Sequence, residues 1–412
     1  MHRTDYRVYS PARIGDLTLP TRWVRSATAD LAPWKLGRFT EDDVELYRIA
    51  ATSGIGMLIV NGPDIVPPSY AQGTALTSVG YSYDDVRIEG TAELLAGIRA
   101  AAPDVAVLAQ IGCNELVSSE IPAGPSPVTS PYYEGRFREL TADEIRWIID
   151  ALVHTAVHMK AEGFDGVQLH AAHGGGLWTF LSPHSNLRSD AYGGSVENRV
   201  RVVAEIVTGV RRELPGFPVL IKANCTDYLD DGIDETNFGD LARALEAAGI
   251  AAIEVSGGTW DALVRSEAEL GFRPVPAAES QTGILDPARQ NYFLPFIQGL
   301  DLGIPLILVG GIRNVEAAEA IVRSGAAEFV AMCRPLIREP DLVERWRVGR
   351  GSADAACIAC NSCIYSMHVP FETMGRRTVT CLAAHDAALH AEAQQWLSTF
   401  IDEIRTDRPN VA

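Results

Sequence analysis

The chain has 412 residues, of which 47% are hydrophobic and 21% charged, and its formal net charge is −18. This composition supports a sizeable core and argues against nucleic-acid binding, which needs clustered Lys and Arg. No apolar run reaches the ~18 residues of a membrane span, no signal-peptide pattern opens the chain, and the seven cysteines do not form a secreted disulfide framework. We therefore expect a soluble cytoplasmic protein.

Short runs rich in β-branched residues alternate with longer helical patterns from end to end. The runs are apolar throughout, which is typical of parallel strands covered on both faces. Eight such runs with helical stretches between them predict a (β/α)8 barrel. A doubly wound sheet is the alternative, but no GxGxxG motif follows the first run. The predicted strands are 23–27, 57–61, 105–111, 166–170, 219–223, 252–256, 306–310 and 328–332.

Segments outside this alternation complete the expected layout. ARIGDLTLP (12–20) predicts an N-terminal hairpin that plugs the bottom of the barrel. Long loops at 112–140 and 257–290 follow the third and sixth strands, at the end of the barrel where such enzymes build their sites. We divide the chain into a barrel domain at 1–350 and a Cys-containing C-terminal extension at 351–412 that ends in a helix.

The seventh and eighth predicted strands end in motifs that suit a phosphate. LVGGIRN (308–314) carries two glycines, which let backbone N–H groups approach an anion closely. AMCRPLI (331–337) adds Arg334, whose guanidinium is a charged fork. The two motifs predict a phosphate-bearing ligand, and a purely structural turn is the alternative.

The segment GFDGVQLHAAHGGGLWTFLSPHSNLRSDAYGGSVENR (163–199) resembles the old yellow enzyme family of FMN-dependent oxidoreductases. In that family the fourth strand carries His-x-x-His or His-x-x-Asn, followed by FLSP and by the pattern N-R-D-YGGS-ENR. SPARIGDLTLPTRWVRSAT, LIVNG, LAQI, LIKAN and AMCRPLIREPDL fall in the family's order and spacing, so the resemblance spans about 8–348. The carboxyl end is similar to the iron–sulfur branch that contains the dienoyl-CoA reductases, although only its barrel portion is present.

The resemblance implies FMN as cofactor and NAD(P)H as co-substrate. Lys222 stands where many relatives have Arg, and a cation there would stabilise negative charge on the reduced flavin. Its alternative role is a lysine paired with a carboxylate at the barrel mouth. The residues implied to bind FMN are Ala27 and Thr28 along its rings, Gly62 and Gln110 at its pyrimidine edge, Lys222, and Gly310, Gly311, Arg313, Cys333 and Arg334 at its phosphate.

His170 and His173 stand at the end of the fourth predicted strand. By the resemblance, both imidazoles donate hydrogen bonds to a substrate carbonyl oxygen, which makes the β-carbon of an enone electrophilic toward hydride. The pair would be the catalytic residues. A structural role is the alternative, and metal ligation would require a third ligand.

Three positions depart from the family pattern. Cys113 replaces a histidine after the third strand, and Ala29 replaces a flavin-tuning Cys or Thr. Gly175 replaces the tyrosine that protonates the substrate α-carbon, which predicts a wider pocket for a bulky substrate. The proton would then come from water or from another tyrosine, the candidates being Tyr81, Tyr132, Tyr133 and Tyr292.

The extension carries four cysteines in the order C-x2-C-x2-C…C, a pattern typical of metal sites. Four thiolates suit either a [4Fe–4S] cluster or tetrahedral zinc. The dienoyl-CoA reductases space the third cysteine one residue further along, so a tail without metal also remains open. The predicted ligands are Cys357, Cys360, Cys363 and Cys381.

Together these features predict an FMN-dependent oxidoreductase that uses NAD(P)H to reduce an activated C=C bond in an α,β-unsaturated carbonyl or a related conjugated compound. The alternatives are a flavin-dependent desaturase or dehydrogenase, a redox-neutral isomerase of a bulky substrate, and a non-catalytic flavin-binding sensor. The expected partners are the small-molecule substrate and NAD(P)H, without nucleic acid or membrane. The choice between NADH and NADPH and the formation of a homo-oligomer are left open by the sequence.

Overall fold

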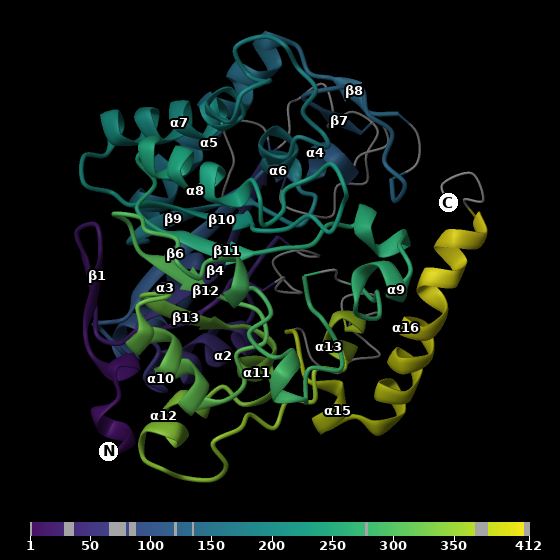
Figure 1. The fold of residues 1–412 in the computed structure, drawn as a ribbon. Helices are drawn as coiled ribbons and strands as arrows, with labels where there is room; N and C mark the ends of the chain where they lie inside the picture. Colours follow the sequence, from purple (N-terminus) through teal and green to yellow (C-terminus); the bar gives the residue numbers. More distant parts are fainter. Residues whose placement is uncertain are drawn as a thin grey trace.

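A closed ring of eight parallel strands forms the centre of the computed structural model, which describes residues 2–28, 37–65, 80–81, 88–118, 122–133, 136–276, 279–366 and 378–407 (Figure 1). Pairing of the first strand with both the second and the last closes the ring. The eight strands are β3 (Trp23–Arg25), β4 (Met57–Ile65), β6 (Ala106–Gly112), β9 (Gly166–Ala171), β10 (Val219–Asn224), β11 (Ile253–Ser256), β12 (Leu306–Leu308) and β13 (Phe329–Met332). Each coincides with a predicted strand, and the barrel prediction is confirmed.

Helices surround the barrel and follow most of its strands (Figure 1). In the described part of the connection from β11 to β12, short turns replace a long helix: η3 (Asp261–Val264), α9 (Glu267–Leu270), η4 (Pro287–Arg289) and η5 (Leu294–Phe296). Glu279, Ser280 and Ile284 of the loop predicted at 257–290 lie at the C-terminal end of the barrel strands. The helices of the ring are α2 (Glu41–Thr52), α3 (Thr91–Ala101), α5 (Ala142–Glu162), α7 (Val196–Glu213), α8 (Phe238–Ala247), α10 (Val315–Ser324), α11 (Arg334–Arg338) and α12 (Leu342–Arg347).

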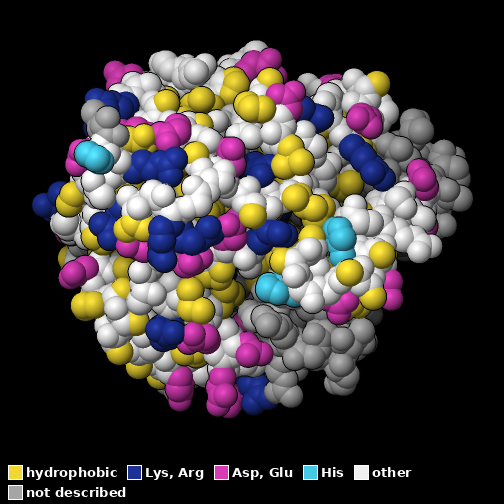
Figure 2. Space-filling view, turned by 90° about the horizontal axis from the view of Figure 1, so that it is seen from below, with side chains coloured by type: hydrophobic (Ala, Val, Ile, Leu, Met, Phe, Trp, Pro, Cys, Tyr) yellow, Lys and Arg dark blue, Asp and Glu magenta, His cyan; other side chains and the backbone are white. Residues whose placement is uncertain are grey.

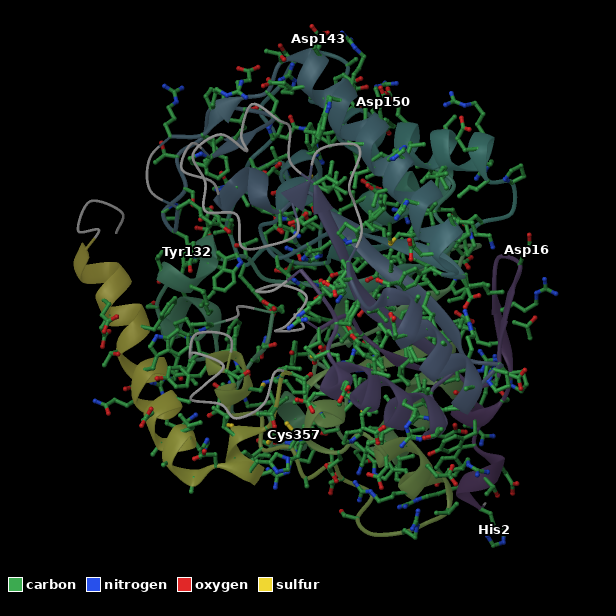
Figure 3. All side chains as sticks on the ribbon, turned by 180° about the vertical axis from the view of Figure 1, so that it is seen from behind. His2, Asp16, Tyr132, Asp143, Asp150 and Cys357 are labelled. Atoms are coloured by element: carbon green, nitrogen blue, oxygen red, sulfur yellow. The ribbon has the colours of Figure 1, made fainter. Side chains whose placement is uncertain are left out.

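The predicted N-terminal hairpin is present and closes one end of the barrel. β1 (Ala12–Ile14) and β2 (Leu17–Leu19) pair antiparallel, and Figure 3 places Asp16 at the exposed tip of this hairpin. Ile14 and Leu19 are fully buried in a cluster with inward-facing strand residues such as Phe329. Because apolar side chains plug this end, the polar residues of a site are left to the other end. Two short elements, η1 (Arg3–Asp5) and η2 (Arg7–Tyr9), precede the hairpin.

The remaining short elements lie in the loops after the second, third and fourth barrel strands. They are β5 (Gly80–Tyr81), which pairs with β4, α4 (Glu115–Ser118), the pair β7 (Ala123–Gly124) and β8 (Arg138–Glu139), and α6 (Gly176–Leu181).

The C-terminal extension ends in a long helix, as predicted, and this helix runs along one side of the barrel (Figure 1). Its apolar side faces inward, where Phe400 packs with Leu263, Tyr132 and Trp260 from the loops at the barrel mouth. Figure 3 shows Tyr132 beside this helix. The elements of the extension are α13 (Ser362–Tyr365), α15 (Leu382–His385) and α16 (Ala387–Asp407).

The surface mixes both signs of charge despite the acidic total. On the face shown in Figure 2, Lys and Arg side chains lie among Asp and Glu side chains. Local ion pairs also form on the surface, such as that of Arg138 with Glu144 at 2.6 Å. Among the described residues, no helix is both long enough and apolar enough to cross a membrane.

Candidate active site

A cavity opens at the C-terminal ends of the barrel strands and holds about 650 Å³ of space free of protein atoms, part of it continuous with solvent. Residues from the ends of β3, β10, β11, β12 and β13 form its wall, together with the loop after β11 and the start of the extension. Thr28 lines an adjoining cavity that holds about 530 Å³ of such space. The predicted site residues in the main wall are Ala27, His173, Lys222, Gly310, Gly311, Arg313, Cys333 and Arg334.

Arg313 lines this cavity and carries buried donors that are not satisfied. The residue is 6% exposed, and one guanidinium nitrogen, Nη2, donates to the carbonyl of Ala355 at 2.9 Å. Its Nε and Nη1 atoms are buried and have no hydrogen-bond partner among the described residues. Buried donors without acceptors are costly, so two such atoms in a cavity wall indicate a site for an anion. The phosphate of FMN fits this donor set.

The two glycines after β12 are required by their backbone and by their neighbours. Gly310 and Gly311 have φ values of 94° and 80°, a region that side chains other than glycine rarely adopt. A Cβ on Gly310 would lie 2.5 Å from the ring of Phe293, and one on Gly311 would lie 2.6 Å from the backbone nitrogen of Asn291. The two glycines therefore allow the loop after β11 to pack against the cavity, and they leave their own backbone uncovered by a side chain.

Arg334 is anchored to the loop after β11 and to the extension. Its Nη1 atom donates to the carbonyl of Gln281 at 3.0 Å and to Oδ1 of Asn361 at 2.5 Å. Cys357 and Ala359 also line the main cavity. The extension thus closes the predicted phosphate end, a contribution that the sequence motifs did not predict.

A buried polar network forms the floor of the site. Lys222 is 4% exposed, donates to Ser26 Oγ at 2.9 Å and lies 3.5 Å from Glu254 Oε1. Lys222 therefore lines the cavity and pairs with a carboxylate, while its effect on a reduced flavin stays a prediction. Gln110 reaches the same network through Gln168. Glu254 and Gln168 were not predicted as site residues, although a charged or amide side chain within an apolar strand run was a usable signal.

Gly62 lies directly against Gln110. A Cβ on Gly62 would stand 2.5 Å from the Gln110 carbonyl oxygen, because β4 and β6 approach closely at this point. The structure thus brings together the two residues predicted to meet the pyrimidine edge of the flavin. Neither forms part of the main cavity wall as described.

His170 and His173 lie side by side, with ring centroids 5.2 Å apart. His173 has a φ of 61°, and its backbone N–H donates to Oδ1 of the buried Asn224 at 3.1 Å, which holds this unusual conformation. Its Nε2 atom lies 2.8 Å from Ser256 Oγ. The Nδ1 atom of His170 is buried without a partner in the described structure. His170 does not belong to the described lining of the main cavity, so its unsatisfied Nδ1 marks a buried polar atom next to His173.

Both imidazoles are neutral at physiological pH. Burial lowers the pKa of His170 to about 3, with a further contribution from the charge of Lys222. Burial also lowers the pKa of His173 well below its usual value, helped by His170 and Lys222. A neutral imidazole carries one N–H and can donate one hydrogen bond. If the Ser256 hydroxyl donates to Nε2 of His173, the proton of that ring lies on Nδ1.

The lowered pKa of His170 predicts a loss of stability in acid. Unfolded histidine binds a proton near its usual pKa while the folded residue stays neutral, so stability falls as pH drops below about 6.5. Between about pH 8 and pH 5 we expect His170 to lower the free energy of unfolding by about 1–2 kcal/mol. Urea denaturation at both pH values checks this, with His170→Gln as reference. An equal pH dependence in the two proteins would contradict the prediction.

The glycines after the histidine pair are dictated by close contacts. Gly174 has a φ of 82°. A Cβ on Gly175 would lie 1.9 Å from Oδ1 of Asn114, and one on Gly176 would lie 2.1 Å from the backbone oxygen of Cys113. The direction in which the tyrosine of relatives would leave the backbone is filled by Asn114. The structure therefore gives no support to the wider pocket predicted from Gly175.

The candidate proton donors lie in different surroundings. Tyr132 and Tyr133 contact each other edge to face, and Tyr132 packs on Trp260. Tyr292 lines the main cavity, but its ring packs over the two glycines at the predicted phosphate end, and its hydroxyl donates to the carbonyl of Glu279 at 2.9 Å. The side chain of Tyr81 and all of Ala29 lie outside the described structure.

Asp227 organises the polypeptide behind the histidines. This fully buried carboxylate accepts hydrogen bonds from Trp178 Nε1 at 2.7 Å, Ser182 Oγ at 2.7 Å, Asn224 Nδ2 at 2.8 Å and the Ile233 backbone at 2.8 Å. Through Asn224 it fixes the backbone of His173. The sequence shows that Asp227 follows Asn224, at the end of a strand, by three residues. It does not show which four groups donate hydrogen bonds to the Asp227 carboxylate.

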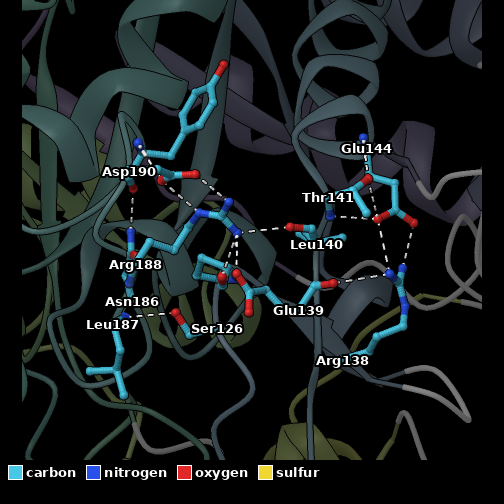
Figure 4. A network of polar contacts seen from close by, with 12 residues as sticks. Ser126, Arg138, Glu139, Leu140, Thr141, Glu144, Asn186, Leu187, Arg188 and Asp190 are labelled. Carbon is cyan, nitrogen blue, oxygen red and sulfur yellow. Dashed lines mark hydrogen bonds and ion pairs between the residues drawn. The ribbon is translucent and has the colours of Figure 1, made fainter.

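The N-R-D-YGGS motif has an architectural role (Figure 4). Arg188 donates to the carbonyls of Pro125 and Leu140, both at 2.9 Å, and pairs with Asp190 at 2.5 Å. The backbone of Leu187 donates to Ser126 Oγ at 2.8 Å. These contacts fasten the loop after β6 to the loop after β9. The motif that carried the resemblance therefore shapes the walls beside the histidines instead of contacting the cavity.

The four cysteines of the extension gather in one region without forming a metal site. The pKa of Cys357 is raised by burial and affected by the charge of Cys381, and that of Cys363 is raised by burial and by nearby thiols including Cys357 and Cys360. Figure 3 shows Cys357 at the base of the extension. No group of three or more His, Cys, Asp or Glu side chains in the described ranges is arranged to hold a metal ion. The arrangement does not fit a metal as it stands.

Known proteins share both the sequence pattern and the fold. Residues 7–352 match the model of the NADH:flavin oxidoreductase / NADH oxidase family. An NADH oxidase from Thermoanaerobacter brockii is 29% identical over 364 residues, which cover 86% of this chain and 52% of that protein, so this chain spans about half its length.

Two solved structures share the fold. A 2-naphthoyl-CoA reductase in complex with 2-naphthoyl-CoA superposes with a TM-score of 0.74 at 23% identity, over 94% of this chain and 58% of that one. An old yellow enzyme homologue from Zymomonas mobilis gives 0.64 at 22% identity, over 85% and 95%. The match to the family model covers most of the chain and confirms the resemblance seen in its motifs. The chain belongs to the NADH:flavin oxidoreductase / NADH oxidase family.

Proposed function

We propose that the protein binds FMN and uses NAD(P)H to reduce an activated C=C bond in an α,β-unsaturated carbonyl or a related conjugated compound. The observation that carries this proposal is the pair of neutral imidazoles, 5.2 Å apart, beside a cavity whose lining residue Arg313 has buried N–H donors suited to a phosphate. The bound FMN would accept a hydride from NAD(P)H and pass it to the substrate. A conjugated thioester, such as the naphthoyl-CoA of the structural neighbour, belongs to this class.

The histidine pair would polarise the substrate carbonyl. N–H groups of His170 and His173 that converge on the carbonyl oxygen stabilise the negative charge that develops there during reduction. Because burial keeps both rings neutral, each ring carries one N–H group that can donate a hydrogen bond. Ser256, which bonds Nε2 of His173, would fix the tautomer that donates. The pair would thus act as an oxyanion-stabilising group.

Proton delivery to the α-carbon would come from water. The usual tyrosine is absent at Gly175, and Tyr292 packs at the opposite, phosphate end of the cavity. The main cavity is continuous with solvent. Water that reaches the substrate from this side supplies the proton without a dedicated side chain.

FMN binding is tested through Arg313. We expect purified protein to release FMN and not FAD, because the phosphate end offers one anion site. Arg313→Met should weaken FMN binding by roughly 10- to 100-fold, the cost of losing about 1.5–3 kcal/mol of charge-assisted hydrogen bonding. Fluorescence titration of flavin-free protein measures this, with the exposed Arg243→Met on α8 as control. Equal affinity in both variants would refute the phosphate assignment.

Metal in the extension remains a prediction. Four thiolates could close around a [4Fe–4S] cluster or zinc only if their side chains rearrange from the positions described. Elemental analysis of anaerobically purified protein should find iron and sulfide at about four per chain for a cluster or zinc at about one. Folded, yellow protein without either metal would remove the prediction. The reaction proposed above needs no step at these cysteines.

A further inference from the structure

Glu254 is a buried carboxylate in the predicted flavin site, and the reaction proposed above assigns it no role. It is fully buried on β11, and in the barrel register it stands directly beside Lys222 on β10. Lys222 in turn stands beside His170 on β9. A charged residue in this position is costly to desolvate unless its partners compensate it. The partners of Glu254 therefore indicate what it does.

Every oxygen of Glu254 is engaged. Oε1 accepts from Ser26 Oγ at 2.5 Å and lies 3.5 Å from Lys222 Nζ, while Oε2 accepts from Gln168 Nε2 at 2.7 Å. Ser26 also accepts from Lys222 at 2.9 Å. The carboxylate is thus held by three neighbours behind the cavity wall, and Lys222 and Ser26 form that wall.

The charge of Glu254 fixes the orientation of two amides. A carboxylate only accepts hydrogen bonds, so Gln168 must turn its NH₂ group toward Glu254. The Gln168 carbonyl then accepts from Gln110 Nε2 at 2.8 Å. Gln110 is left with its carbonyl oxygen free of this chain of bonds, and an acceptor there suits the N3–H donor of an isoalloxazine ring.

The same charge offsets that of Lys222. A lysine at the cavity wall favours a ligand that gains negative charge on reduction, and an anion 3.5 Å behind it opposes this effect. We propose that Glu254 is a positioning residue that lowers the reduction potential of the bound flavin by compensating Lys222 and by orienting Gln110. This inference rests on the proposed binding of FMN.

The isosteric variant Glu254→Gln tests the inference. It removes the charge and introduces an amide that can donate, so Gln168 and Gln110 are no longer forced into one orientation. We expect the ratio of the affinities for reduced and oxidised FMN to be at least tenfold higher in the variant than in wild type. For a two-electron couple this is a rise in midpoint potential of about 30 mV or more. Anaerobic dye-linked titration of the FMN-loaded proteins measures the potential.

Two further variants make the result specific. Glu319→Gln, which alters another buried carboxylate on α10 outside this site, should leave the potential unchanged. Lys222→Gln should lower the midpoint potential. The double variant Lys222→Gln/Glu254→Gln should have a higher midpoint potential than Lys222→Gln. If Glu254→Gln does not fold, the potentials of Lys222→Gln and of the double variant are compared instead. The double variant lacks Lys222, so it leaves no buried lysine without its carboxylate partner.

The outcomes separate this inference from the proposed function. Protein that folds but binds no FMN contradicts the proposed function itself. Protein that binds FMN normally, but whose potential is unchanged or lowered in Glu254→Gln, overturns the inference while leaving FMN binding intact. A rise that also occurs in Glu319→Gln overturns it as well, because the effect would then not come from this network.

Discussion

Replacement of His170 or His173 with alanine is expected to lower turnover of a conjugated ketone by about 10²-fold or more. Each change would remove one of the two N–H donors that we propose bind the carbonyl oxygen, where charge develops in the transition state. The rings lie 5.2 Å apart and are neutral, so neither can replace the other's hydrogen bond by protonation. Steady-state kinetics with cyclohexenone measures the loss.

The histidine variants also carry internal controls. FMN content should stay close to that of wild type, because the predicted phosphate contacts come from β12 and β13 and not from β9. Phenol-type ligands should lose their long-wavelength charge-transfer band in both variants. His154→Ala, on the outer helix α5, should behave like wild type. Full activity in the double histidine variant would refute the assignment.

Asp227→Asn is expected to destabilise the protein by about 3 kcal/mol or more, as breaking a buried charged network does. An amide cannot replace this carboxylate in either orientation. One oxygen accepts from Trp178 and Asn224, and the other from Ser182 and the backbone of Ile233. Wherever the NH₂ group is placed, it meets an N–H donor and leaves both groups unsatisfied.

The effect of Asp227→Asn should reach the active site. Asn224 loses its anchor, and with it the His173 backbone loses the contact that supports a φ of 61°. We expect lower turnover in the fraction that remains folded, together with a lower thermal midpoint. Thermal unfolding followed by circular dichroism measures the stability. Asp231→Asn, at a largely exposed carboxylate nearby, should leave it unchanged, and equal stability of the two variants would contradict the role of Asp227.

The barrel could be predicted from sequence because each strand is a mostly apolar run without regular polar alternation and each lies between helical patterns. Runs such as 219–223 are buried along their whole length, so no alternation obscured them. The hairpin plug followed from ARIGDLTLP for a similar reason, since Ile14 and Leu19 need a place in the core. These features depend on short stretches of chain and on burial alone.

The polar network could not be predicted in this way. Glu254 is paired with Lys222 across strands that are distant in sequence, and its effect on Gln110 passes through Gln168. The space beside Gly175 is filled by Asn114, from a loop some sixty residues earlier in the chain. The wider pocket that we predicted from the missing tyrosine side chain therefore finds no support. Contacts between separate loops carry no local signature in the sequence.

One anaerobic experiment on the FMN-loaded protein shows whether it carries hydride from NADPH to a conjugated ketone. NADPH is added first, followed by cyclohexenone, while the flavin absorbance is recorded. We expect bleaching by NADPH and full recovery of the flavin absorbance on addition of the ketone. In the His170→Ala/His173→Ala variant we expect bleaching but very slow recovery. Bleaching of the wild-type protein that no conjugated carbonyl reverses, or recovery at the wild-type rate in the double variant, would contradict the proposed function.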